Sequence, residues 1–465
     1  HHKTVGSYWF IALSIRSFGN SELALRLPSI VASFLCLFIS YLIAIKLSNK
    51  QSALISLFSL SSMPLWIQYS RYASPDLPFV LCIQLVILFF LKFLDASQYI
   101  NKYFYIFISA LFLSSSFFIR SYMAFVPLIG LSPFFVYHLV RSKNIFKTLF
   151  FSGILVGSFP TILNLYYSYQ KFGLIGITSL FDFAKKQAMD GVPFTNVFLI
   201  PLNYIYLTFP IGILLVFLFV FTRSNRSVRY PLLIYWYPFL SLLILLCMST
   251  SYPHYYLYLL PPLSILFSIK LNSYSFKNSF SKGSIKFLLF LLIIFICCIL
   301  VFIPIYYNYL IIDYPYSTTL YVYFVFFLLL LSYVSSLRYL YDSRSFRFNL
   351  FKFFVNIAIP QYISLSLLYN FGILGNPNFK TKSFLNDKDV SLIIRSNTIY
   401  LYSVDSKIQT LLSYYLPSSK VIDDFEDIKR NDYIITSDIN TFKDKTLFGS
   451  IKIIDNLFLL TNINK

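Results

Sequence analysis

Charged side chains are scarce in this sequence. Only 12% of its residues are Asp, Glu, Lys or Arg, whereas soluble domains carry about 25%. Acidic residues are the rarer of the two charged kinds, with 18 Asp and Glu against 38 Lys and Arg in 465 residues. Hydrophobic residues make up 57%, and the mean hydropathy is +0.69. This composition excludes a soluble globular protein. We expect a polytopic α-helical membrane domain over residues 1–375 and a small soluble domain over 376–465.

Glycine and cysteine are also scarce, and their placement excludes two kinds of site. The 13 glycines form no nucleotide-binding pattern, so neither a nucleotide nor a redox cofactor is predicted. The five cysteines lie in apolar segments without metal-ligand spacing and are expected to pack as small apolar side chains. No basic segment forms a soluble face, so the net charge of +20 does not indicate a nucleic-acid partner.

Long apolar runs recur along the chain, and each is close to the length that crosses a bilayer. We predict about twelve spans from these runs. They cover residues 27–46, 51–70, 77–95, 103–119, 122–140, 147–167, 197–222, 230–250, 255–271, 285–306, 316–337 and 350–373. Residues 1–25 are expected to form interfacial helices on one face of the membrane, because an aromatic amphipathic segment runs from Tyr8 to Arg16.

Basic residues are concentrated in alternate loops, and this asymmetry predicts the orientation. Loops such as 141–147, 223–229 and 338–352 carry several Lys and Arg, whereas the intervening loops carry few. Since cytoplasmic loops collect basic residues, we expect the first set inside a plasma (inner) membrane. The exoplasmic set is then 1–25, 70–77, 119–122, 168–196, 251–255, 307–315 and the C-terminal tail.

The tail resembles a small α/β domain. A strand is predicted at 398–403, a helix at 406–416, and further short strands at 419–422, 432–436 and 451–454.

Asp76 is one of very few acidic residues in the membrane part, and it is expected at the exoplasmic start of a span. A carboxylate there is costly unless it caps a helix, pairs or takes part in chemistry. In Ser74-Pro75-Asp76-Leu77-Pro78 it stands where an N-cap is expected, and capping alone is a sufficient explanation. A role as a ligand for a metal, a sugar or an acceptor is compatible with that position.

Several cations share the exoplasmic side. Arg120 ends a span and either extends to the interface or holds a phosphate. Lys185 lies in the long loop 168–196, where a solvated charge run is the simpler explanation. His254 opens a tyrosine-rich segment that either forms an interfacial aromatic belt or contributes to a site, and Pro261-Pro262 predicts a helix kink. No ionisable group lies at the middle of a span, which argues against a carrier.

Three segments together resemble the GT-C glycosyltransferases, in particular the protein mannosyltransferase and aminoarabinose transferase superfamily. They are His2-Lys3-Thr4-Val5-Gly6-Ser7-Tyr8-Trp9 with the following Leu25-Arg26-Leu27-Pro28, then Ser70-Arg71-Tyr72 with Pro75-Asp76-Leu77-Pro78, and His254-Tyr255-Tyr256-Leu257-Tyr258-Leu259-Leu260-Pro261-Pro262. The motifs cover residues 2–270. Thr4-Val5 departs from the proline that usually follows the lysine.

The resemblance implies a GT-C-like bundle that takes a polyprenyl-phosphate sugar from the exoplasmic face. It also implies a further helix and the principal catalytic acid upstream of residue 1, so this chain would retain only the second acid, Asp76. A divalent metal ion would be held by His2 and Asp76. The candidate ligands of the donor phosphate or substrate are Lys3, Arg71, Arg120, Lys185, His254 and Tyr255.

The sequence therefore predicts a membrane enzyme that transfers a sugar to a lipid, glycan or protein acceptor. A lipid-linked glycan polymerase or ligase is the first alternative. A non-enzymatic carrier or flippase is the second, and a chain that is inactive in the form given is the third.

Overall fold

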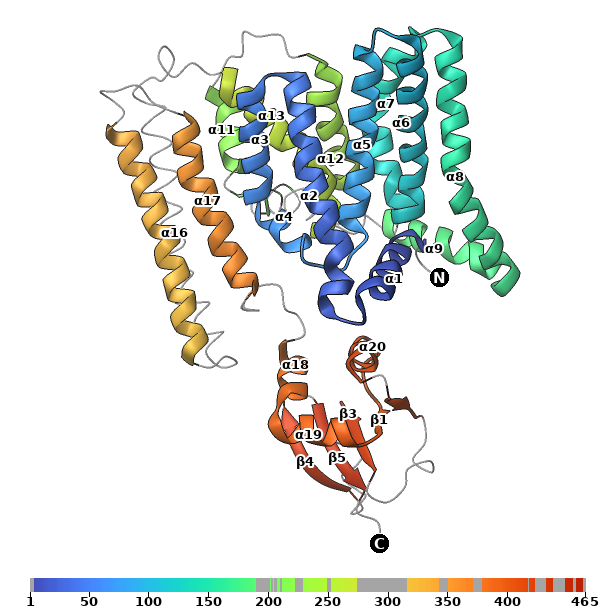
Figure 1. Ribbon diagram of the computed structural model, residues 1–465, viewed down its shortest axis with the longest axis vertical. Helices are drawn as coiled ribbons and strands as arrows, with labels where there is room; N and C mark the ends of the chain where they lie inside the picture. Colours follow the sequence, from blue (N-terminus) through green and yellow to red (C-terminus); the bar gives the residue numbers. More distant parts are fainter. Residues whose placement is uncertain are drawn as a thin grey trace. The chain divides into compact units, whose positions relative to one another are not determined.

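The computed structural model contains a large helical unit and a small mixed α/β unit (Figure 1). It describes residues 4–189, 201, 204, 207–209, 211–221, 229–248, 252–273, 316–342, 350–370, 379–416, 418–422, 432–437, 448–454 and 457–462. The first unit runs from His1 to Leu368 and the second from Tyr369 to Lys465. The division falls seven residues before the boundary expected at 375, close to the end of the last helix of the bundle.

The described part of the first unit consists entirely of helices and connections. They are α1 (Gly6–Phe18), α2 (Glu22–Leu47), α3 (Lys50–Ser62), α4 (Pro64–Tyr69), α5 (Asp76–Asp95), α6 (Tyr99–Arg120), the 3-10 turn η1 (Ser121–Ala124), α7 (Phe125–Val140), α8 (Asn144–Phe172), α9 (Ile175–Met189), α11 (Ile211–Phe221), the π-helical turn η2 (Leu232–Trp236), α12 (Tyr237–Leu246), the 3-10 segment η3 (Pro253–Leu259), α13 (Leu260–Ser273), α16 (Tyr316–Asp342) and α17 (Leu350–Asn370). The predicted span 285–306 lies outside the described residues.

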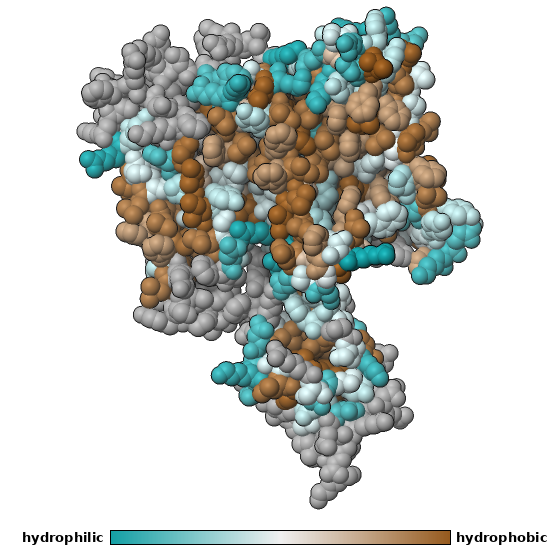
Figure 2. Space-filling model, in the orientation of Figure 1, coloured by the Kyte–Doolittle hydropathy of each residue, from teal (hydrophilic) through white to brown (hydrophobic). Residues whose placement is uncertain are grey.

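Apolar residues cover the outside of this unit as well as its interior. Four stretches of described residues are long and apolar enough to cross a membrane: Glu22–Leu47, Asp76–Asp95, Tyr99–Val140 and Asn144–Phe172. Large apolar side chains on these helices are exposed, for example Phe34 at 71% and Leu155 at 70%. Figure 2 shows this as a broad hydrophobic band. Such a surface needs lipid around it, so the first unit is an integral membrane domain.

Small residues line the helix–helix contacts inside the unit. Gly153 and Gly157 of α8 face the backbone of α6, where any side chain would collide with the carbonyls of Phe107 and Leu111. This small-xxx-small spacing lets two helices approach closely, as is common in membranes. Buried serines such as Ser56, whose hydroxyl lies 2.9 Å from that of Ser264, add hydrogen bonds between α3 and α13.

The predicted span 51–70 is broken. Met63 separates α3 from α4 with an extended ψ of 130°, because Pro64 cannot continue the hydrogen bonding of α3 and instead starts a new helix. The break directs α4 and the following loop 70–75 toward the start of α5, where the hydroxyl of Ser29 on α2 donates to the carbonyl of Ser74 at 3.2 Å.

Ion pairs lie at the two opposite ends of the antiparallel helices α5 and α6. At the end formed by the basic loops, Asp95 accepts from Lys46 at 2.6 Å and from Arg229 at 2.7 Å, which joins α2, α5 and the segment before η2. At the other end, Asp76 begins α5 and Arg120 ends α6.

The described residues of the second unit form a five-stranded sheet and three helices. The strands are β1 (Ile399–Tyr402), β2 (Lys420–Val421), β3 (Tyr433–Thr436), β4 (Phe448–Ile454) and β5 (Leu457–Asn462), in the order β2-β1-β3-β5-β4. The helices are α18 (Phe379–Asn386), α19 (Lys388–Ser396) and α20 (Ser406–Tyr415). The first three strands are parallel, and β5 and β4 continue the sheet antiparallel. The α/β prediction for the tail is confirmed, although α18, α19 and β5 were missed.

Candidate functional site

Asp76 and Arg120 form a buried ion pair at the end of the bundle opposite the basic loops. A guanidinium nitrogen, Nη2, lies 2.8 Å from Oδ1 of Asp76, and the two side chains are 8% and 6% exposed. The antiparallel packing of α5 and α6 brings the first residue of one helix beside the last residue of the other. The pair therefore places a fixed negative charge and a fixed positive charge in direct contact at this end of the bundle.

The capping role considered for Asp76 is wrong. Pro75 occupies the N-cap position with helical φ and ψ, and no side chain caps the helix. Asp76 is the first helical residue, where its charge is favourable near the positive end of the helix dipole. Its carboxylate instead turns to Arg120. The prediction that Arg120 extends into the interface is wrong for the same reason, since a side chain paired with Asp76 and 8% exposed does not reach open water.

Two serine hydroxyls next to this pair are buried. Ser74 precedes Asp76 by two residues and Ser121 follows Arg120, and neither Oγ atom has a hydrogen-bond partner within the residues that the structure describes. Ser121 also adopts a φ of +56°, which is unusual for a residue other than glycine and marks a strained turn between α6 and η1. Buried hydroxyls normally form hydrogen bonds, so these two are candidates for binding a polar ligand beside the ion pair.

Tyr69, at the end of α4, links the ion pair to His254. Its hydroxyl lies 3.5 Å from Nδ1 of His254, and it is near enough to Asp76 and Arg120 to interact electrostatically with both. Its ring also meets that of Tyr72, at 5.3 Å between centroids. The sequence reasoning missed Tyr69. The only signal available was its position just before the Ser70-Arg71-Tyr72 motif.

His254 lies among tyrosine rings. Tyr252 stacks on it with an interplanar angle of 4°, and Tyr255 meets it edge-on at 4.6 Å between centroids. Tyr255 is 3% exposed, and its neighbours Tyr256 and Tyr258 are also buried, at 1% and 2% exposure. The tyrosines of η3 are therefore interior side chains, and an aromatic belt at the lipid interface is not what this segment forms.

Arg71 holds the loop 70–75 to another helix. Its Nη1 donates to the carbonyl of Ser366 on α17 at 3.0 Å, and the residue is half-buried. This contact gives Arg71 a role in fixing the loop that carries Asp76. Its predicted contact with a donor phosphate stays a prediction.

The outer segment α1 packs against the same end of α6. Thr4, which is 1% exposed, donates its hydroxyl to the carbonyl of Phe117 at 3.3 Å, and Trp9 meets the ring of Phe118 edge-on. The expected helix is thus present as α1, next to the helix end that carries Arg120, and its location at the membrane interface stays a prediction. His2 and Lys3 lie outside the described residues.

Lys185 is exposed on α9, and the structure shows no bond from it to any other described residue. The same helix contacts the turn after Arg120 through Phe181, whose ring lies 5.3 Å from that of Tyr122. No group of three or more His, Cys, Asp or Glu among the described residues could hold a metal ion. Because His2 is not among them, the predicted pair of His2 and Asp76 as metal ligands is not tested.

The apolar helical bundle defines the class of this protein. It is a polytopic membrane protein with a GT-C-type helical fold and a small α/β unit, as the sequence predicts.

Residues 2–167 match the family model described as dolichyl-phosphate-mannose-protein mannosyltransferase. Among solved structures, ArnT from Cupriavidus metallidurans bound to undecaprenyl phosphate is similar with a TM-score of 0.77 and 14% identity, over 100% of this chain and 88% of that one. The apo form of ArnT gives a TM-score of 0.76 at 14% identity, over 99% and 88%. The structural likeness shows the fold. Together with the family match, it confirms the GT-C resemblance.

A curated relative from Aquifex aeolicus (strain VF5), described as an uncharacterised protein, is 25% identical over 279 residues. The match covers 58% of this chain and 53% of the relative, so the chain spans about half the length of that relative.

Proposed function

We propose that this protein is a membrane glycosyltransferase that takes its sugar from a polyprenyl phosphate at the exoplasmic face. The family match over residues 2–167 supports a sugar transferase, and the similar ArnT structure contains undecaprenyl phosphate. The observation that carries the proposal is the buried Asp76–Arg120 pair at the end of the bundle opposite the basic loops. The acceptor is the hydroxyl of a lipid, glycan or protein.

The reaction requires few protein groups, because the donor already carries its leaving group. The acceptor oxygen forms a bond to the anomeric carbon, the bond from that carbon to the phosphate oxygen breaks, and the acceptor proton passes to a base. A polyprenyl phosphate leaves with the bonding electrons. A nearby cation stabilises its growing negative charge, and Arg120 is the best placed of the described candidates because it ends α6 at this site.

Asp76 is assigned a binding and orienting role. Its carboxylate lies against the guanidinium of Arg120, so we expect it to accept hydrogen bonds from a sugar or acceptor hydroxyl and to hold the arginine in place. The hydroxyls of Ser74 and Ser121 offer further hydrogen bonds to the same ligand. Tyr69 and His254 form the adjoining wall, 3.5 Å apart at their polar atoms.

The test compares three variants of the full-length protein in proteoliposomes that contain a radiolabelled polyprenyl-phosphate sugar. Asp76→Asn should lower transfer at least about a hundredfold, the cost of about 2.7 kcal/mol of transition-state stabilisation. The double variant Asp76→Asn/Arg120→Gln removes both charges, so it avoids an uncompensated buried charge. Asp182→Asn, which changes an exposed carboxylate on α9, is the matched control and should retain full activity.

The double variant separates function from stability. If the pair only stabilises the fold, the neutral double variant regains both its thermal midpoint and its transfer activity, and the proposal fails. If the pair binds substrate, stability returns while transfer stays low. Movement of the labelled lipid across the bilayer without any new glycosidic bond would instead favour a carrier.

A further inference from the structure

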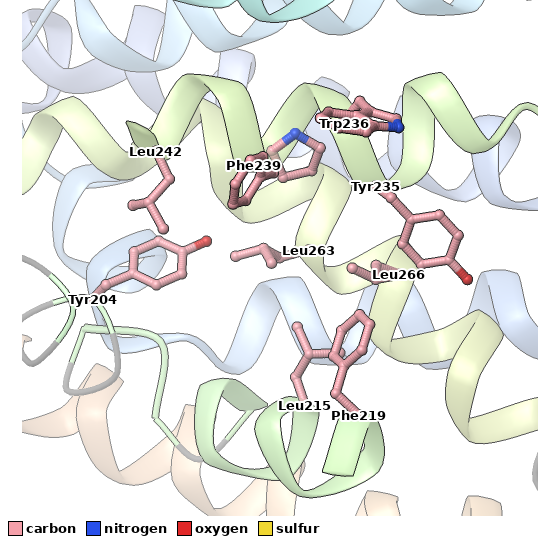
Figure 3. Close-up of a pocket in the computed structure, with 10 residues that line it drawn as sticks. Tyr204, Leu215, Phe219, Tyr235, Trp236, Phe239, Leu242, Leu263 and Leu266 are labelled. Carbon is pink, nitrogen blue, oxygen red and sulfur yellow. The ribbon is translucent and has the colours of Figure 1, made fainter. Parts of the chain in front are cut away.

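An apolar groove lies between α11, η2, α12 and α13, and none of its lining residues belongs to the site around Asp76. Its volume is about 590 Å³, within the range of roughly 300–1,000 Å³ for ligand pockets. The lining residues are Tyr204, Leu215, Phe219, Tyr235, Trp236, Pro238, Phe239, Leu242, Leu263 and Leu266. In Figure 3, side chains of α11 and of η2 with α12 face Leu263 and Leu266 from opposite sides.

The groove is open on the side of the bundle that faces lipid. Trp236 and Phe239 on its rim are 49% and 55% exposed, and Phe219 is 43% exposed. Apart from two tyrosine hydroxyls and the indole nitrogen, the lining side chains are hydrocarbon. Such a surface accepts an alkyl chain and offers a water-soluble ligand very little.

Lys270 stands at one end of this groove. It follows Leu263 and Leu266 on the same face of α13, since residues three, four and seven apart lie along one stripe of a helix. Its ammonium lies 4.7 Å from the ring centre of Phe219 and 5.8 Å from that of Tyr235, both of which line the groove. The residue is only 8% exposed, and these two distances place its ammonium at the aromatic end of the groove.

The Lys270 end of the groove is the end of the bundle that the basic loops form. Tyr235 and Trp236 belong to η2, which begins three residues after Arg229, a member of the Asp95 ion-pair cluster at that end. The opposite end of the groove is marked by Tyr204, whose ring lies 5.6 Å from Tyr256 in η3, the segment that carries His254. The groove therefore extends from the His254 side toward the predicted cytoplasmic side.

We propose that this groove binds a phospholipid of the cytoplasmic leaflet that has an anionic headgroup. One acyl chain lies along Leu263 and Leu266, and the phosphate approaches the ammonium of Lys270. Tyr235 and Trp236 lie at headgroup depth, where amphipathic aromatic side chains are enriched. Basic pockets between transmembrane helices on the cytoplasmic side are recognised sites for anionic lipid headgroups, and the ammonium of Lys270 selects for negative charge.

The test is native mass spectrometry of the full chain, released from nanodiscs that contain equal amounts of phosphatidylglycerol and phosphatidylcholine with matched acyl chains. The wild type should retain phosphatidylglycerol in preference. Lys270→Met should lower that preference about fivefold, which corresponds to the roughly 1 kcal/mol contributed by one basic residue near a membrane surface. Lys270→Arg keeps the charge and should keep the preference.

A second lysine provides the matched control. Lys92 of α5 lies over Phe89 and Tyr105 at 5.3 and 5.5 Å, at the same end of the bundle but outside the groove. Lys92→Met should leave lipid retention unchanged. Leu263→Trp fills the groove and should release the lipid while Lys270 is still present.

Three results would overturn this inference. They are equal retention of the two phospholipids by the wild type, equal losses in the Lys270→Met and Lys92→Met variants, and displacement of the retained phospholipid by added polyprenyl phosphate. The readout is lipid binding and not sugar transfer, so its outcome is independent of the proposed enzymatic activity.

Discussion

Arg120 carries its charge into a site where its side chain is only 8% exposed, and Asp76 supplies the opposing charge at 2.8 Å. A buried pair of this kind contributes little net stability compared with apolar residues of the same shape. Removing one partner is costly, because the remaining charge is left uncompensated in a poorly solvated place. The pair is therefore a residue-scale feature whose two halves must be kept or removed together.

Arg120→Met should lower the free energy of unfolding by about 3–5 kcal/mol, since it leaves Asp76 buried and unpaired. Arg120→Lys keeps the positive charge but loses the planar guanidinium group, so it should lower the free energy of unfolding by less. The measurement is thermal unfolding of the purified protein in detergent. Arg26→Met, which opens a surface ion pair with Glu22 whose side chains are 45% and 39% exposed, should change the midpoint little. A midpoint for Arg120→Met equal to that of the wild type would contradict the structural argument.

The sequence identified both members of this pair without indicating that they meet. Asp76 was singled out because a carboxylate in a lipid-embedded segment is costly, and Arg120 because it ends a span. Their contact depends on how far α5 and α6 slide along each other, which no local pattern specifies. The same limit explains why the Lys46–Asp95–Arg229 cluster was not predicted.

At the scale of elements, Gln361 of α17 connects four parts of the bundle. Its amide nitrogen donates to the carbonyls of Ser62, at 3.0 Å, and Phe209, at 2.8 Å, and its amide oxygen accepts from the hydroxyl of Tyr333 at 3.0 Å. Ser62 is the last residue of α3 at the proline-induced break, so its carbonyl is one of those at a helix end that have no hydrogen-bond partner within the helix. α17 also receives the hydrogen bond from Arg71, so Gln361 helps to hold the helix on which the loop before Asp76 rests.

Gln361→Met should lower the free energy of unfolding by about 2 kcal/mol, at roughly 0.6 kcal/mol for each of three interhelical hydrogen bonds in a membrane. Tyr333→Phe removes one of the three bonds and should cost about a third as much. Tyr362→Phe changes an exposed neighbour on α17 and is the control. Unfolding in mixed micelles measures all three variants. Equal losses for Gln361→Met and Tyr333→Phe would show that the carbonyl contacts contribute nothing.

The helices were easier to predict than their interruptions. Periodicity and apolar length located α2, α5, α6, α8, α16 and α17 to within a few residues, because lipid imposes both. The break at Met63 was missed since Pro64 lies inside a continuous apolar run. Pro261 and Pro262, which were expected to kink a helix, lie in the first turn of α13, directly after the 3-10 segment η3, where proline is tolerated. β5 was missed because its apolar run does not alternate.

At the scale of the whole molecule, composition predicted a membrane bundle followed by a soluble part, and local strand and helix patterns predicted that this part is α/β; the fold agrees with both. The proposed chemistry additionally requires that the Asp76 end faces the exoplasm. That orientation is predicted from the distribution of basic residues, since Lys46, Arg229 and Lys143 gather at the opposite end. A polyprenyl-phosphate donor presented at the exoplasmic face could reach Asp76 only in this orientation.

Cysteine labelling in intact cells tests the orientation directly. In a variant whose five native cysteines are replaced by alanine, Ala73→Cys places a thiol on the exposed loop before Asp76, and Asn101→Cys places one at the opposite end of the bundle. A membrane-impermeant maleimide should modify residue 73 in intact cells and residue 101 only after permeabilisation. The reverse pattern would put the Asp76–Arg120 pair on the cytoplasmic side, where the donor assumed here is not presented. The proposed transfer reaction would then fail, although the ion pair and the fold would stand.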